Sequence, residues 1–288
     1  MLKSCKITGF ADEIDKDLNT QLSVLKELGQ KFIELRSADG VNIADMTIEK
    51  ALEVKDRLQA AGVEVSALGS PIGKISILEE FEEHFQKFIH VVKLAKIFET
   101  PYIRVFSFYI PEGEETEKYS DEVFKRIGQL VKYASENDVV LLHENEKGIY
   151  GEDADRCKQL MEKFYGKNFG CTFDFANFVQ CGQDTIEAYN LLEPYIVYVH
   201  VKDACKKDGE VVLAGDGDGN VKEIFELLDK KDYQGYLSLE PHLFNFVGLD
   251  KLESGEIIKK EKNGIAAYKA AYNRLKELTL TDIKSEEK

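Results

Sequence analysis

Short apolar segments alternate with amphipathic segments along nearly the whole chain, and this alternation restricts the possible folds most. Eight segments are rich in β-branched, aromatic and aliphatic residues, which is typical of buried strands. These are residues 5–10, 31–36, 63–69, 102–108, 139–144, 169–175, 196–202 and 236–242. Between them, segments such as 47–62 and 120–137 place apolar residues three and four positions apart, which predicts helices. Several of these segments end in Gly or Asn, where a left-handed C-terminal cap is expected.

Eight strand and helix pairs predict a (β/α)8 TIM barrel, a fold that typically needs about 250 residues. A doubly wound open sheet is the alternative, and the lack of a GxGxxG turn after any strand disfavours it. We predict a single barrel domain over residues 1–278 and a polar tail over 279–288. Residues 243–264 form a segment that is longer than the usual connection between a strand and a helix, and it includes Phe244 and Phe246. We therefore expect it to cover the barrel mouth or to contact another subunit.

Composition and charge narrow the class of function. The formal net charge of −15 repels phosphodiester polymers, so a nucleic-acid partner is not expected. The chain has neither a run of about 18 apolar residues nor the opening pattern of a signal peptide, so we expect no membrane partner and a cytoplasmic location. Five cysteines without CxxC spacing favour reduced thiols over a disulfide framework or a thiolate zinc site.

Four potential metal ligands lie at the ends of four successive predicted strands. They are Glu144, Asp174, His200 and Glu240. The C-terminal ends of parallel barrel strands meet at one rim, so these side chains are expected to converge. One imidazole with three carboxylates suits a single divalent ion of the Mn²⁺, Mg²⁺, Co²⁺ or Zn²⁺ type and argues against copper or an iron–sulfur cluster.

Several short motifs give the chain a specific resemblance. GFADE, IELR, HENEK, FDFANF, HVKD and LEPH occur in this order from the first strand to the last. With them the chain resembles the xylose isomerase-like barrel superfamily, in the branch of sugar-phosphate isomerases, epimerases and inosose dehydratases. The resemblance implies that Glu144 and Glu240 are metal ligands that also act as the acid and base pair, and that Asp174 and His200 complete the coordination.

The chemistry expected from this resemblance is proton transfer next to a ketone, through a cis-enediolate that a divalent ion stabilises. Return of the proton to the opposite face gives epimerisation, and return to the adjacent carbon gives isomerisation. Loss of a β-hydroxyl instead would make the protein a lyase of the inosose dehydratase type. A sugar-binding barrel without turnover is a further alternative, whereas an apurinic-site endonuclease is disfavoured by the few histidines and the acidic charge. The expected partner is a sugar or sugar phosphate, and a homo-oligomer remains open.

Further residues at strand ends are candidates for substrate binding. Asn177 stands where the family often has a histidine, and it is a candidate for binding a substrate hydroxyl or for capping a loop. Asp203 is a candidate for orienting His200 or a substrate hydroxyl, or for an ordinary turn. His143 is expected to face away from the metal and pack. The remaining candidates share a place near a strand end: Lys202, Lys147, Arg36, Arg104, Glu34, Glu146, His242, Ser70 and Lys74.

Two glycine-rich segments lack known ligand motifs. Residues 69–75 have too few residues between their glycines for a P-loop and have Ile75 after the lysine. Residues 214–220 lack the glycine and the final acid of a calcium loop. Because barrels often hold phosphate after strands seven and eight, Gly217 and Gly219 are either anchors for a substrate phosphate or part of a flexible turn.

Overall fold

The computed structural model describes residues 2–244 and 263–280 and contains an eight-stranded parallel sheet. The strands follow the order β1-β12-β9-β8-β7-β6-β5-β2, and each neighbouring pair is parallel. All eight overlap the predicted segments: β1 (Lys6–Gly9), β2 (Phe32–Leu35), β5 (Glu64–Ile72), β6 (Tyr102–Val105), β7 (Val140–Glu144), β8 (Phe169–Asp174), β9 (Ile196–Val201) and β12 (Tyr236–Leu239).

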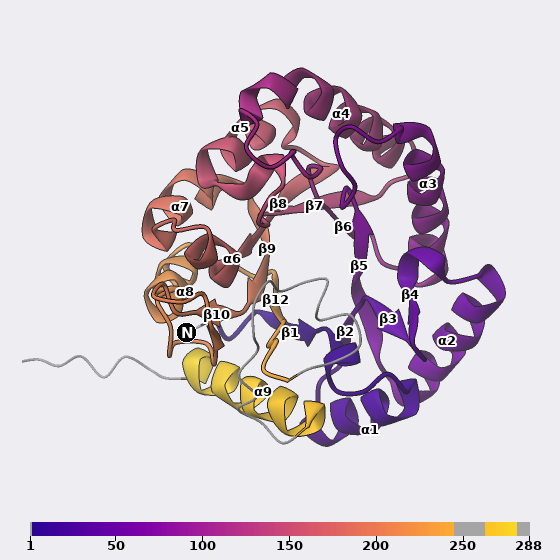
Figure 1. Ribbon diagram of the computed structural model, residues 1–288. Helices are drawn as coiled ribbons and strands as arrows, with labels where there is room; N and C mark the ends of the chain where they lie inside the picture. Colours follow the sequence, from indigo (N-terminus) through magenta and orange to yellow (C-terminus); the bar gives the residue numbers. More distant parts are fainter. Residues whose placement is uncertain (1, 245–262, 281–288) are drawn as a thin grey trace, which may run out of the picture.

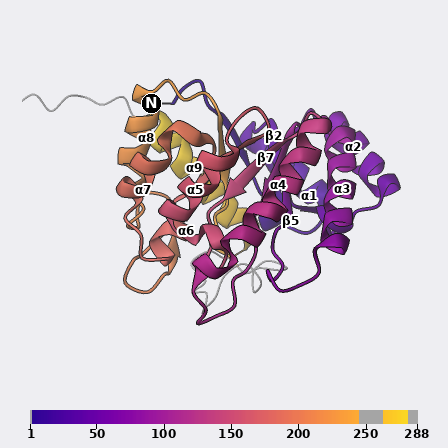
Figure 2. The ribbon, with the colours of Figure 1, turned by 90° about the horizontal axis from the view of Figure 1, so that it is seen from above.

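The sheet curls into a barrel whose two edges, β1 and β2, face each other, and Figure 1 shows the strands as a ring inside a circle of helices. Figure 2 shows the helices along the outside of this ring. The predicted (β/α)8 TIM barrel is therefore confirmed. Among the described residues, no helix combines the length and apolar character needed to cross a bilayer.

Side-chain caps mark the start of several outer helices. Asp17, Thr47, Asp153 and Asp184 each accept a backbone N–H bond in the first turn of a helix. The helices are α1 (Leu18–Leu28), α2 (Ile48–Ala61), α3 (Phe81–Ile97), α4 (Ser120–Glu136), α5 (Ala154–Phe164), α6 (Phe175–Gln180), α7 (Thr185–Leu192), α8 (Val221–Lys230) and α9 (Gly264–Leu280).

The predicted left-handed caps are partly correct. Gly62, after α2, has φ of 69° and ends the helix as expected. After α4, however, Asn137 has φ of −118°, and Asp138 takes the left-handed position with φ of 55°. The last helix, α9, includes Thr279 and Leu280, so it extends two residues into the predicted tail.

Two short hairpins and several 3-10 helices add to the connections between strands and helices in the described residues. The hairpins are β3 (Ser37–Ala38) with β4 (Val41–Asn42), and β10 (Asp203–Ala204) with β11 (Val211–Val212). The 3-10 helix η1 (Ala11–Glu13) follows β1. Most of the connection predicted to cover the mouth, residues 245–262, and the tail 281–288 lie outside the described residues.

The barrel interior is filled by side chains below the site. Ala67, Leu142 and Tyr198 form a buried cluster there. The hydroxyl of Ser66 shares hydrogen bonds with Thr8 Oγ1 at 2.7 Å and with the Tyr198 hydroxyl at 2.9 Å. These bonds give the buried hydroxyl groups hydrogen-bond partners. Without partners, the hydroxyls would lower the stability of the folded protein. The larger apolar core lies between the strands and the surrounding helices.

Candidate active site

The four predicted ligands meet at the C-terminal ends of adjacent strands. Glu144 ends β7, Asp174 ends β8, His200 lies in β9 and Glu240 directly follows β12. Asp174 and His200 are register partners, as are His200 and Ser238. One ligand atom from each of the four side chains lies within 4.8 Å of the others, and all four residues are buried.

The residues at this centre fit a divalent cation. Oδ2 of Asp174 and Oε2 of Glu240 are buried and accept no hydrogen bond within the described residues. Nζ of Lys202 lies 3.7 Å from each of these oxygens, too far for a hydrogen bond. Buried carboxylate oxygens without a partner are costly, and an oxygen-seeking metal ion would remove this cost. The nitrogen and oxygen donor set also matches the preference of Mn²⁺, Co²⁺ and Zn²⁺.

Glu34 orients the imidazole of His200. Nδ1 of His200 faces the ligand set, 2.8 Å from Oε1 of Glu144 and 3.5 Å from Oε2 of Glu240. Nε2 lies 3.2 Å from Oε2 of Glu34, and the Ser238 hydroxyl donates to that same oxygen at 2.6 Å. A carboxylate that accepts the second N–H of a ligand imidazole fixes its tautomer and raises its basicity. The structure thus places Glu34 behind His200.

Two buried arginines hold the two glutamates of this predicted ligand set. Nη1 of Arg104 donates to Oε2 of Glu144 at 3.2 Å and lies 3.7 Å from Oε1 of Glu240. Nη1 of Arg36 donates to Oε1 of Glu240 at 3.1 Å. The ring of Phe10 lies beside both guanidiniums, with its centre 4.4 Å from Cζ of Arg36 and 4.9 Å from Cζ of Arg104. The arginines therefore position the two proposed proton carriers.

The first βα connection contributes acids that sequence reasoning did not single out. Asp12 accepts two hydrogen bonds from Arg36, at 2.8 and 3.0 Å, and Glu13 accepts a third at 3.2 Å. Glu13 also accepts the backbone N–H of His242 at 2.8 Å, and Nε2 of His242 lies 3.4 Å from Oε1 of Glu240. GFADE was noted only as part of the resemblance, yet it holds the acids that fix Arg36.

Asn145 fixes the position of Asp174, and this residue was not identified from the sequence either. Its side chain accepts the backbone N–H of Asp174 and donates to the Asp174 carbonyl, both at 3.0 Å. Oδ1 of Asp174 then accepts the backbone N–H of Asn177 at 2.7 Å, which caps α6. The side chain of Asn177 donates to the carbonyl of Asn145 at 2.8 Å. The side chain of Asn177 therefore holds the connection after β7, and its binding of substrate stays a prediction.

Two further predicted residues lie at the rim as an ion pair. Nζ of Lys74 is 2.6 Å from Oε2 of Glu146, and it lies 4.4 Å from the centre of the Phe106 ring. The hydroxyl of Ser70 donates to the carbonyl of Arg104 at 2.5 Å, so it braces the strand that carries Arg104. Lys147 is exposed beyond β7. Contacts of these residues with a substrate stay predictions.

The predicted contact of Asp203 with His200 is wrong. The carboxylate of Asp203 accepts backbone N–H bonds from its own connection, including those of Gly217 and Gly219. Strand alternation explains the difference, because Lys202 reaches toward Asp174 while its neighbour Asp203 faces the loop. His143 packs as predicted: it is fully buried, and its Nε2 lies 3.0 Å from the Ser107 hydroxyl.

The ionisation of the ligands differs although all are buried. Burial opposes charge on Glu144, but His200 and Arg104 outweigh it and lower the pKa of Glu144 to about 2. Burial raises the pKa of Asp174 to about 7, even though Lys202 acts in the opposite direction. Burial also opposes charge on Glu240, but Lys202 and His242 hold its pKa well below the ordinary value. Both glutamates are therefore carboxylates at neutral pH.

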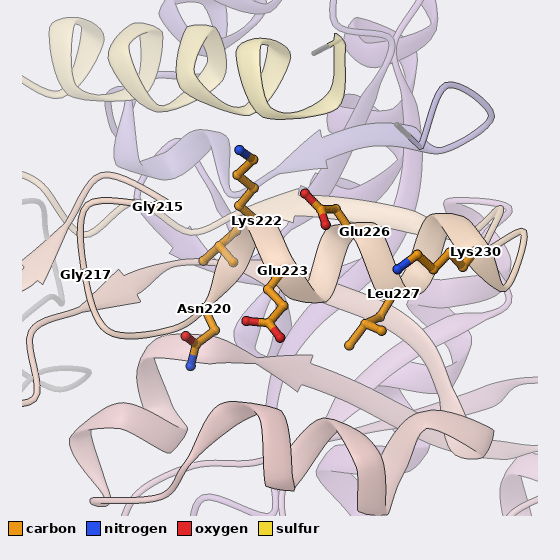
Figure 3. A pocket seen from close by; sticks show the side chains of 9 residues that line it. Gly215, Gly217, Asn220, Lys222, Glu223, Glu226, Leu227 and Lys230 are labelled. Atoms are coloured by element: carbon orange, nitrogen blue, oxygen red, sulfur yellow. The ribbon is translucent and has the colours of Figure 1, made fainter. Parts of the chain in front are cut away.

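A separate hollow of about 470 Å³ extends along α8, from Val221 to Lys230, and Gly215 and Gly217 also line it. Figure 3 shows that the side chains around it point in different directions, with Lys222 on one side of α8 and Asn220 and Glu223 on the other. They do not converge on a common point. This hollow therefore lacks the convergence of side chains that the four predicted ligands have.

Comparisons with known proteins agree with this architecture. The chain is 27% identical to the inosose dehydratase of Clostridium perfringens over 145 residues, which are 44% of this chain and 48% of that protein, so the match spans about half of that relative. The structure of the IOLI protein with a bound zinc atom aligns over 95% of this chain and 97% of that one, with 14% identity and a TM-score of 0.75.

A D-psicose 3-epimerase from Clostridium cellulolyticum H10, solved with D-tagatose, aligns over 95% of this chain and 98% of that one, with 12% identity and a TM-score of 0.74. At such identities the structural likeness shows the fold. The family described as "Xylose isomerase-like TIM barrel" matches residues 22–276. With the barrel, the rim site and this match together, the chain belongs to the xylose isomerase-like TIM barrel family.

Proposed function

We propose that this protein is a divalent-metal-dependent isomerase or epimerase that acts on a ketose or ketose phosphate by proton transfer through a cis-enediolate, with Glu144 and Glu240 as the acid and base pair. Epimerases and dehydratases are both among the proteins it is similar to. Glu144, Asp174, His200 and Glu240 would hold the metal. When bound, the ion would act as a Lewis acid that stabilises negative charge developing on a ketone oxygen.

One observation carries the proposal: two ionised glutamates approach the same small space from separate strands. Glu144 comes from β7 and Glu240 from beyond β12, and β8 and β9 lie between them in the sheet. Nη1 of Arg104 lies within 3.7 Å of an oxygen of each glutamate. This shared guanidinium supports the charged form of both groups while fixing their positions. One carboxylate can then accept a proton from carbon, and the other can take up a proton from a substrate hydroxyl or from solvent and deliver it to the opposite face.

The surrounding side chains support proton transfer in a site shielded from water. Phe10 is fully buried, and its ring meets the His200 ring edge-on with centres 5.3 Å apart. All four proposed ligands are buried as well. Electrostatic interactions are stronger in such a water-poor site than in bulk water.

A dehydratase of the inosose type is the second candidate, because the match to the Clostridium perfringens enzyme favours it. The same carboxylates would first remove the proton beside the ketone. The other glutamate, after taking up a proton from solvent, would then protonate a departing β-hydroxyl instead of carbon. The residues that move protons are identical in the two reactions, so only the product separates them.

Solvent deuterium incorporation tests the proposal. Metal-loaded protein in D₂O should place deuterium on the carbon beside the ketone in at least one member of a broad panel of ketoses, with detection by NMR. Glu144→Gln and Glu240→Gln should each lower the exchange rate by several orders of magnitude, on the order of 10³-fold or more. An absorbing enone or dione product would identify the lyase instead, and no exchange and no product would refute both.

A further inference from the structure

The connection between β9 and α8 folds around one side chain, Asp203. Its carboxylate accepts backbone N–H bonds from four residues: Ala204 at 2.8 Å, Gly215 at 2.8 Å, Gly217 at 3.1 Å and Gly219 at 2.9 Å. The residue is fully buried. Backbone N–H groups that converge in this way form an anion-binding turn, and phosphate is a common occupant of such turns. Here the occupant is a carboxylate of the protein itself.

The turn fits closely around this carboxylate. A Cβ added to Gly217 would lie 2.5 Å from Oδ1 of Asp203, and one added to Gly219 would lie 2.6 Å from the same oxygen and 3.1 Å from Cβ of Phe175. No side chain could be accommodated at either glycine without a shift. A phosphate could therefore reach these N–H groups only after Asp203 leaves them.

The position of the turn links it to substrate binding. β9 is the seventh strand of the barrel ring along the chain, and barrels frequently hold a substrate phosphate in the connections after strands seven and eight. The turn also adjoins the metal centre, because Lys202 directly precedes Asp203 and Phe175 directly follows Asp174. Asp203 therefore occupies the place where a phosphorylated substrate would be expected to be held.

The cations around the ligand set are also engaged by carboxylates. Within the described residues, four of them are buried or half-buried: Arg36 faces Asp12 at 2.8 Å, Lys74 faces Glu146 at 2.6 Å, Arg104 faces Glu144 at 3.2 Å and Lys202 faces Asp174 at 3.7 Å. A substrate anion would have to compete with these carboxylates for each cation. Acidic groups next to a bound anion add repulsion that weakens its binding.

We propose that Asp203 is a specificity-determining residue: it fills the anion-binding turn after β9, so that the site takes an uncharged keto polyol and rejects the corresponding phosphate ester. This inference rests on the proposed function, since it names the substrate class of the same site. Asp203 acts by occupying N–H groups and need not touch the substrate.

The first experiment compares matched substrates. Metal-loaded wild-type protein is assayed by deuterium exchange with ketoses and with their terminal phosphate esters. We expect kcat/KM for the uncharged ketose to exceed that for its phosphate ester by about tenfold or more. The phosphate group needs hydrogen-bond donors, and the carboxylate of Asp203 already occupies them and repels the phosphate charge. A phosphate ester with equal or higher kcat/KM than its parent would overturn the proposal.

The second experiment measures anion binding without turnover. Metal-free protein is titrated with inorganic phosphate and followed by ³¹P NMR line width. The wild-type protein should not bind phosphate saturably, whereas Asp203→Gly should, because it leaves the N–H groups of the turn without their carboxylate. Asp203→Asn is the matched control: its amide has the same size and still fills the turn, although its NH2 group cannot accept the two N–H bonds that one carboxylate oxygen accepts. This variant should not bind phosphate saturably.

The two experiments separate the two ideas. Saturable binding of inorganic phosphate by the wild-type protein would overturn the role of Asp203 even if ketoses are turned over. If no ketose or ester reacts, the proposed function fails, and the phosphate titration still decides whether Asp203 closes the turn. If Asp203→Gly does not fold, the wild-type titration and the substrate pairs remain decisive.

Discussion

Nε2 of His200 lies 3.2 Å from Oε2 of Glu34, on the side of the imidazole away from the ligand set. Glu34 is itself fixed by the hydroxyl of Ser238. We predict that Glu34→Gln lowers metal affinity by about 10 to 100-fold, because the imidazole loses the charged acceptor that raises its basicity and a neutral amide accepts the N–H more weakly. Metal titration followed by calorimetry measures this. Glu146→Gln, which removes a rim carboxylate paired with Lys74, is the control and should leave metal affinity near the wild-type value.

Metal loading should stabilise the folded protein. Asp174 and Glu240 bury carboxylate oxygens that accept no hydrogen bond within residues 2–244 and 263–280, and a cation would satisfy both. At a metal concentration about 100 times Kd, the free energy of unfolding should rise by about 2.7 kcal/mol. Thermal unfolding with and without chelator measures the shift. Asp174→Asn should reduce it, and an equal shift in this variant would contradict the proposed ligand set.

Asn145→Ala should lower both stability and activity. The side chain makes two hydrogen bonds to the backbone of Asp174, and their loss leaves buried polar groups without partners, at a cost of about 1–3 kcal/mol. Asn168→Ala is the matched control, since it removes a 2.7 Å bond to the Val139 carbonyl at the opposite end of β8. That variant should lose stability and keep the exchange rate of the folded protein. Equal losses of activity in both variants would contradict a positioning role for Asn145.

Gly69→Ala should disturb the site through Phe10. A Cβ on Gly69 would lie 2.5 Å from Cε1 of Phe10, whose ring packs against two guanidiniums. Overpacking of this kind costs about 1–3 kcal/mol, and displacement of the ring should also lower the deuterium exchange rate. Gly128 lies within α4, and in Gly128→Ala the new Cβ would lie 3.5 Å from the ring of Phe164, an ordinary contact distance. That control should be neutral or slightly stabilising, by up to about 1 kcal/mol.

Acid should destabilise the protein partly through His84. Its Nε2 accepts the backbone N–H of Gly73 at 2.7 Å, and burial, with Lys87 nearby, lowers its pKa from 6.5 to about 4, against the pull of Glu79. Between these values the unfolded chain binds more protons than the folded protein. The stabilising contribution of the neutral His84 imidazole is therefore fully present above pH 6.5, and it is lost as the pH drops toward 4.

Urea denaturation at pH 7 and pH 5 measures this loss. At pH 5 the free energy of unfolding should be lower by about 2 kcal/mol because of His84. His84→Gln can keep an acceptor for Gly73 without titrating, so its stability should fall less between the two pH values. A fall as steep as that of the wild type would assign the acid sensitivity to other groups.

The barrel order of the strands and the convergence of the four candidate ligands were predictable for related physical reasons. Eight apolar segments of strand length, separated by amphipathic segments, leave few topologies other than a parallel barrel. In such a barrel the strand ends share one rim, so Glu144 and His200 had to lie near each other once the strands were identified. The confirmed part of the prediction depends on periodicity and connectivity alone.

What escaped prediction depends on the conformations of connections and side chains. Asp203 and Lys202 are sequence neighbours at a strand end, and only the path of the following connection decides that Asp203 turns to Gly215 and Gly219. Asn145 looks like any polar residue after a strand until its two bonds to Asp174 are seen. These contacts are set by rotamers and loop geometry, which leave no periodic trace in the sequence.

The pairing of β1 with β12 has a consequence for synthesis on the ribosome. Hydrogen bonds join Lys6–Gly9 to Tyr236–Leu239, so the first strand of the ring receives this neighbour only after the chain has grown past residue 239. Pairing over such a sequence separation is entropically slow. Until then, a nascent chain exposes the unpaired edge of β1, which makes partial translation products candidates for chaperone binding and for edge-to-edge association.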